Sequence, residues 1–137
     1  MALKTYEGVL ERLGTGEFAQ TGTAKRYDVI VVGGQDIRNV ATGGYVNSFL
    51  DVGKQVTLYV GRLFFMKYIY AVRTEHGLKK MPTSWFIGSA AARLVLTFAF
   101  LMFGSLFGGV GTLIMLGLIG YMWYRFVQSL LSYRALN

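Results

Sequence analysis

One uncharged segment constrains this chain more than any other feature. Residues 94–124 form a 31-residue run without a charged side chain, bounded by Arg93 and Arg125. Uncharged runs of about 18 residues or more are typical of membrane-spanning helices, and a helix in a soluble core rarely needs one so long. The composition agrees, because 53% of the residues are hydrophobic. The run therefore predicts an integral membrane protein.

The length of the run indicates how often the chain crosses the membrane. A single helix through it would be about 46 Å long, well beyond a hydrocarbon core of about 30 Å. Glycines at the centre of the run divide it into two arms, so we expect a hairpin of two transmembrane helices, with a single crossing as the alternative. The predicted parts are helix 85–107, glycine turn 108–111, helix 112–132 and a cytoplasmic tail, 133–137.

The charges are distributed unevenly along the chain. All seven acidic residues lie at or before Glu75. The basic residues that follow it have no acidic neighbour: Lys79, Lys80, Arg93, Arg125 and Arg134. A hairpin places these charges on one side of the membrane, where the positive-inside rule locates the cytoplasm. We therefore expect a bacterial inner membrane protein with both termini cytoplasmic. The absence of cysteine agrees with a cytosolic location of the residues before the uncharged run.

The part before the membrane segment is predicted to be β-structure. Short β-prone runs are separated by glycine-rich turns: 3–13, 23–32, 36–41, 55–60 and 63–72. This pattern predicts a small antiparallel β-barrel or sheet, OB-like or SH3-like, over residues 1–76. Residues 77–84 form a basic hinge whose Pro82 suits the first turn of a helix. The predicted class is an α+β membrane protein: a β domain followed by the two-helix transmembrane hairpin.

Small residues recur at helical spacing in the membrane segment. We assign them to helix packing or oligomer contacts: Gly104, Ser105, Gly108, Gly109, Gly117 and Gly120. Small side chains let membrane helices approach closely. Two interpretations stay open, namely packing of the hairpin's own helices and contact with another chain.

The arginines that bound the run are predicted to lie inside the membrane, one to two turns from its surface. Ionisable residues in membrane segments often mark functional sites. Arg93 and Arg125 could extend to the lipid phosphates, pair with a partner's carboxylate or line a polar path. Aromatic residues are expected to anchor the helices at the interface: Trp85, Tyr121, Trp123, Tyr124 and Tyr133.

Aromatic and basic residues alternate around the last predicted strand. The candidate binding strand contains Arg62, Phe64, Phe65, Lys67, Tyr68, Tyr70 and Arg73. Aromatic side chains between cations hold single-stranded nucleic acid in OB folds. The same residues also suit the core of a small barrel or an interface, and this interpretation is favoured over nucleic-acid binding.

No catalytic, metal-binding or cofactor-binding motif is present. Gly33-Gly34 follows a β-prone run but lacks the spacing of a dinucleotide-binding loop. His76 is the only histidine, so we expect no metal site. We also expect no cofactor and no enzyme activity, because no set of a nucleophile and a base is apparent. The sequence favours a structural or accessory membrane subunit that contacts lipid. It would assemble into a homo-oligomer or a larger membrane complex through its small-residue helix faces and its cytoplasmic β domain. The alternatives are a membrane-tethered single-stranded nucleic-acid-binding module and a component of a transporter or channel.

Overall fold

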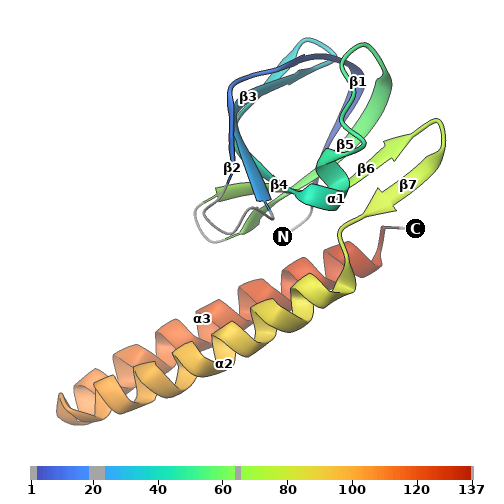
Figure 1. Cartoon of the computed structure of the whole chain (residues 1–137). Helices are drawn as coiled ribbons and strands as arrows, with labels where there is room; N and C mark the ends of the chain where they lie inside the picture. The colour runs from blue at the N-terminus through green and yellow to red at the C-terminus, as the bar shows by residue number, and fades with distance from the viewer. Residues whose placement is uncertain (1–2, 19–23, 64–65, 137) are drawn as a thin grey trace. The chain divides into compact units, whose positions relative to one another are not determined.

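The computed structural model describes residues 3–18, 24–63 and 66–136. The chain divides into two compact units at the Met81–Pro82 junction. The first unit is a β-barrel with one short helix, and the second consists of two long helices (Figure 1). The protein is therefore α+β, as the sequence predicts.

The first unit is built from short strands joined mostly by tight connections. Its elements are β1 (Lys4–Leu13), β2 (Gly16–Phe18), β3 (Ala24–Val32), β4 (Gln35–Gly43), α1 (Gly44–Asn47), β5 (Gln55–Leu63), β6 (Met66–Thr74) and β7 (Gly77–Lys80). Five strands close into a ring in the order β1-β5-β6-β4-β3, and β3 pairs with β1. β2 extends the ladder beside β3, and β7 pairs with β6. The sequence did not predict β2 or β7, and β7 occupies residues expected to belong to the basic hinge.

One contact in the ring is parallel, which corrects the expectation of an antiparallel barrel. β4 and β6 run in the same direction from the pair Val40–Lys67 to the pair Thr42–Ile69. The other neighbouring strands of the ring are antiparallel. Parallel partners need a crossover connection, so this pairing joins segments separated by a helix and a strand. Local residue patterns carry no signal for such a contact.

Strand β1 pairs with two different strands along its length because it bends. Its first half pairs with β5 and its last residues pair with β3. The ladder shifts between Leu10 and Arg12, and such bulges sharpen the local bend of a strand. Gly8, with φ +149°, allows a further close approach, because a Cβ atom there would lie 2.5 Å from the Cα atom of Gly33.

The alternation of buried and exposed residues is regular in β5 but is interrupted in β4 and β6, where consecutive residues are buried. Val56, Leu58 and Val60 of β5 are buried, as a two-residue period requires. In β6, by contrast, five consecutive residues from Tyr68 onward are buried. The ladder shifts here by one residue, which leaves Tyr70 as the bulged position.

The predicted strand 63–72 is wrong, because it combines parts of two strands. β5 ends at Leu63 and β6 begins at Met66, and these two residues are antiparallel partners. A continuous run of β-prone residues conceals the reversal between them. Residues 64–65 of the predicted strand lie outside the described residues.

The second unit contains α2 (Thr83–Ser105) and α3 (Gly108–Arg134). Both helices are long and apolar enough to cross a membrane. The break between them falls at Leu106 and Phe107, and α3 begins at Gly108 with φ +72°. The predicted glycine turn, 108–111, therefore forms the start of α3 rather than the connection.

Candidate functional site

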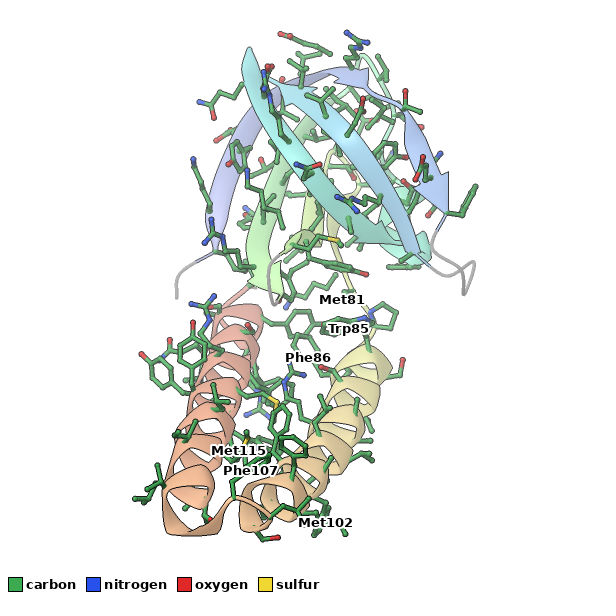
Figure 2. The ribbon with its side chains drawn as sticks, turned by 90° about the vertical axis from the view of Figure 1, so that its left-hand side faces the viewer. Met81, Trp85, Phe86, Met102, Phe107 and Met115 are labelled. Carbon is green, nitrogen blue, oxygen red and sulfur yellow. The ribbon has the colours of Figure 1, made fainter. Side chains whose placement is uncertain are left out.

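The two helices pack closely beside their connection, where two glycines face each other. A Cβ atom at Gly104 would lie 3.0 Å from Met115 Cγ and 3.3 Å from the carbonyl oxygen of Gly111. A Cβ atom at Gly111 would lie 2.5 Å from Phe107 Cβ and 3.0 Å from the carbonyl oxygen of Gly104. Figure 2 shows Met115 and Phe107 in this region. The predicted small-residue contact therefore serves, at Gly104, the packing of the hairpin itself.

Arg93 is buried between the two helices, with only 5% of its surface exposed. Its guanidinium carbon lies 4.6 Å from the ring centroid of Phe126 on α3, within the range of a cation–π contact. Nη1 donates hydrogen bonds to the carbonyl oxygen of Ser89, at 3.1 Å, and to Ser89 Oγ. The helical unit contains no Asp or Glu, so a carboxylate of its own cannot compensate this charge.

A hydrogen bond between side chains joins the helices next to Arg93. Trp123 Nε1 on α3 donates to Thr97 Oγ1 at 3.0 Å, and this hydroxyl donates to the carbonyl oxygen of Arg93 at 2.8 Å. Trp123, expected as an interfacial anchor, therefore binds the facing helix. This cluster was not predicted from the sequence, although Ser89, Arg93 and Thr97 recur every four residues, which is the spacing of one helix face.

The contact surface between α2 and α3 is called the seam. Aromatic rings continue this seam toward the helix ends that are remote from the connection between α2 and α3. Phe86 is buried, and its ring centroid lies 4.7 Å from Tyr133 and 6.3 Å from Phe126 (Figure 2). Trp85 packs edge-on against Phe86 at 5.3 Å. These contacts give the hairpin a specific register along its whole length.

Arg125 has a different environment from that of Arg93. It is half-buried, and its guanidinium carbon lies 5.9 Å from the ring centroid of Tyr121 on its own helix. Its carbonyl oxygen accepts a hydrogen bond from Ser129 Oγ at 3.0 Å. Within the described residues, only Arg93 of the two lies buried on the seam.

The remaining small residues of the predicted face point away from the seam. A Cβ atom at Gly108, Gly109, Gly117 or Gly120 would meet no atom within 4 Å. Ser105 is exposed, and its hydroxyl donates to the carbonyl oxygen of Met102 at 2.7 Å. Gly117 and Gly120 therefore leave an open strip on α3 that the hairpin does not use.

The candidate binding strand is divided between two strands of the barrel. Arg62 on β5 is directly opposite Lys67 on β6. Arg73 lies toward the other end of β6, 6.0 Å from the ring centroid of Tyr59. Phe64 and Phe65 lie outside the described residues.

Its two tyrosines belong to the buried part of β6. Tyr68 and Tyr70 are 6% and 1% exposed, and their ring centroids are 5.9 Å apart. Burial, and to a lesser degree the proximity of Tyr70, raises the pKa of Tyr68 to about 12. Buried rings offer no face on which a base could stack.

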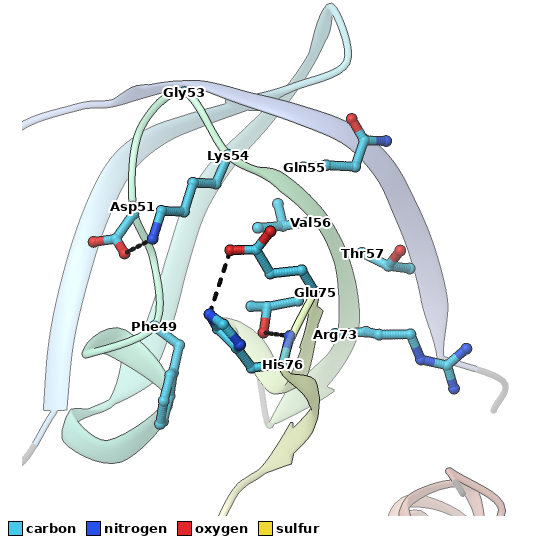
Figure 3. A pocket seen from close by; sticks show the side chains of 11 residues that line it. Phe49, Asp51, Gly53, Lys54, Gln55, Val56, Thr57, Arg73, Glu75 and His76 are labelled. Carbon is cyan, nitrogen blue, oxygen red and sulfur yellow. Dashed lines mark hydrogen bonds and ion pairs between the residues drawn. The ribbon is translucent and has the colours of Figure 1, made fainter.

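An open pocket of about 650 Å³ lies beside the α1–β5 loop and the β6–β7 turn (Figure 3). Two ion pairs lie at its edge: Lys54–Asp51 and His76–Glu75, each 3.3 Å long. All four side chains are more than half exposed, and such pairs contribute little stability. Among the residues that the structure describes, no cluster of metal-ligating side chains occurs.

No protein-family model matches this chain, and comparisons with curated proteins and with solved structures find no match.

Proposed function

We propose that this chain is a non-enzymatic integral membrane subunit that assembles with other copies of itself or with a larger membrane complex. The observation that carries the proposal is that α3 has two different faces, one packed in the hairpin and one open. Phe126 and Trp123 hold the hairpin together, whereas Gly117 and Gly120 face away from it.

The exposed surface of the helices supports membrane insertion. Large apolar side chains are exposed on both of them, including Val95 at 69%, Met102 at 73% and Leu113 at 70%. A hairpin in water would have to cover such a surface, whereas lipid solvates it directly. The buried Arg93 fits the same setting, because ionisable residues in membrane segments face the interior of the bundle. Its cation–π contact supplies part of the stabilisation that water would otherwise provide.

The open strip on α3 supports assembly. Helix association in membranes depends on close van der Waals packing, which small residues permit. Gly117 and Gly120 are three residues apart, so they lie on one face of the helix. A partner helix could therefore approach α3 there without disturbing the seam with α2.

The barrel is proposed to be of the OB type rather than SH3-like. The support is its ring order, β1-β5-β6-β4-β3, with one parallel contact between the third and fifth ring strands in chain order. The short helix α1 lies between the third and fourth of these strands, as in OB barrels. We propose a cytoplasmic location for the barrel and both termini in a bacterial inner membrane, supported by Lys79 and Lys80 before α2 and Arg134 at the end of α3.

Assembly is tested by adding bulk to the open strip. The double variant Gly117→Leu/Gly120→Leu should fold but lose its oligomer or its co-purifying subunits in native mass spectrometry of detergent extracts. Gly88→Leu is the matched control, because a Cβ atom at Gly88 on α2 also meets nothing within 4 Å. A monomeric wild-type protein without partners, or a double variant that assembles normally, would contradict the proposal. Membrane insertion is tested separately by resistance to extraction at alkaline pH.

A nucleic-acid-binding module is the second candidate, and the OB-like ring order is the observation that favours it. The burial of Tyr68 and Tyr70 argues against binding by the strand that first suggested it. Titration of the full chain in detergent with a labelled single-stranded oligonucleotide at low salt tests this candidate, because phosphate contacts make binding strongly salt-dependent.

A further inference from the structure

Cations gather where β1, β5 and β6 meet at one end of the barrel. Arg62 and Lys67 are directly opposite each other in the β5–β6 ladder. Lys4 on β1 is opposite Val60. Val60 lies two residues from Arg62 and therefore on the same face of β5. Directly opposed side chains are about 5 Å apart at Cβ and diagonal neighbours about 7–8 Å. Three like charges therefore lie close together.

A fourth cation joins this group from β3. The row of paired residues that starts at Val60 continues through Ile69 and Thr42 to Lys25. The Lys25 ammonium lies 5.2 Å from the ring centroid of Phe18, which is 70% exposed. We call these four cations the basic end: Lys4, Lys25, Arg62 and Lys67.

The described acidic side chains do not offset this group. Of these acidic residues, Glu17 lies nearest to the basic end in the strand register. It is opposite Arg26 in the β2–β3 ladder. Glu7 lies three residues from Lys4 and therefore on the other face of β1. Opposed like charges destabilise a sheet, so the basic end is better explained by binding than by folding.

The chain leaves the barrel in the direction of the basic end. β7 is antiparallel to β6, and its pairing runs from Gly77 opposite Thr74 to Lys80 opposite Ala71. It therefore approaches the end where β6 begins. The start of β1 and the end of β7 lie at the same end of the barrel (Figure 1). α2 begins at Thr83, so a membrane that holds α2 is within reach of this end.

We propose that the basic end binds the anionic phosphate headgroups of the bilayer surface. This inference rests on the proposed membrane insertion, because the tether to α2 is what selects lipid over other polyanions. Clusters of four or more Lys and Arg residues next to a transmembrane helix are attracted to anionic lipid. The exposed Phe18 beside Lys25 adds an apolar side chain suited to the interface.

The test places a fluorescent donor at the basic end of the full chain. Because the sequence contains no cysteine, Thr5→Cys supplies a single labelling site on an exposed position of β1. Val52→Cys, in the loop before β5, supplies the reference site. Energy transfer to labelled headgroups is measured in vesicles of phosphatidylcholine, with and without phosphatidylglycerol.

Transfer from residue 5 should rise with phosphatidylglycerol and fall in 1 M salt, where the Debye length is about 3 Å. Replacing all four cations of the basic end by Gln should weaken this docking roughly fivefold per charge removed. The matched control replaces Arg12, Arg38, Lys54 and Arg73 by Gln. It removes the same charge elsewhere and should keep the response.

Equal responses of the two quadruple variants would overturn the proposal, as would transfer that is independent of phosphatidylglycerol. Oligonucleotide binding that requires the basic end, without a response to phosphatidylglycerol, would overturn it in favour of nucleic acid. Failure of the proposed function is seen separately, because a chain that does not insert is extracted from vesicles at alkaline pH.

Discussion

Gly8 shows how a single position can determine whether the barrel closes. The β3–β4 turn consists of Gly33 and Gly34, both with positive φ, and the turn packs against β1 at Gly8. The Gly33 N–H donates to the Val9 carbonyl oxygen at 3.0 Å, which fixes this approach. No other residue type offers the space that this crossing needs.

Gly8→Ala is therefore expected to lower the free energy of unfolding by about 3 kcal/mol, since it adds backbone strain and a steric conflict. Gly34→Ala is the matched control, because its φ is +76° but a Cβ atom there meets nothing within 4 Å. It should cost only about 1 kcal/mol. Denaturant titrations of the full chain in detergent measure both values, and equal costs would show that strain alone matters at Gly8.

Tyr68 gives the barrel a dependence on alkaline pH. Its pKa is raised from about 10 to about 12, so the unfolded chain loses this proton first as the pH rises. The stabilisation is present below pH 10 and is lost between about pH 10 and pH 12, by up to 2–3 kcal/mol. Tyr68→Phe should flatten this part of the stability profile, as measured by unfolding at each pH. An unchanged slope would assign the effect to other tyrosines.

At the scale of the elements, the link between Thr97 and Trp123 is expected to be cooperative. Thr97→Val and Trp123→Phe each remove the hydrogen bond that joins α2 to α3. A double-mutant cycle should give a coupling energy of about 0.6–1 kcal/mol, the range of hydrogen bonds between membrane helices. Stability of the hairpin in mild detergent is the measurement. Additive effects would mean that the bond contributes nothing beyond packing.

The sequence predicted the elements whose residue patterns are local. The uncharged run indicated two long apolar helices, and the alternation of Val56, Leu58 and Val60 indicated β5. It did not predict the reversal between β5 and β6, because no glycine lies between Leu63 and Met66. It also did not predict the bulge at Tyr70, because an extra residue disturbs the two-residue period. The parallel pairing of β4 with β6 depends on contacts distant in sequence. Arg93 was predicted to be a notable residue because it is ionisable and borders an apolar run. Its burial was not predicted, because that burial depends on contacts with α3, which is distant in sequence.

At the scale of the whole molecule, each unit contains the contacts that define it. The ring of five strands closes within residues 3–81, and the helical seam lies within Pro82–Leu136. A fragment of residues 1–81 is therefore expected to fold in water without detergent and to unfold cooperatively. Circular dichroism during thermal unfolding measures this. A fragment that is unfolded or insoluble would show that the barrel depends on the helices.

The parallel contact between β4 and β6 also sets an order of events during synthesis. Until residues 67–69 have left the ribosome, β4 has an unpaired edge, and such edges are templates for aggregation. β6 ends at Thr74, before the first residue of α2 emerges. The nascent chain can thus close its ring before its apolar helices emerge. Unpaired strand edges and exposed apolar helix surfaces therefore need not be present at the same time.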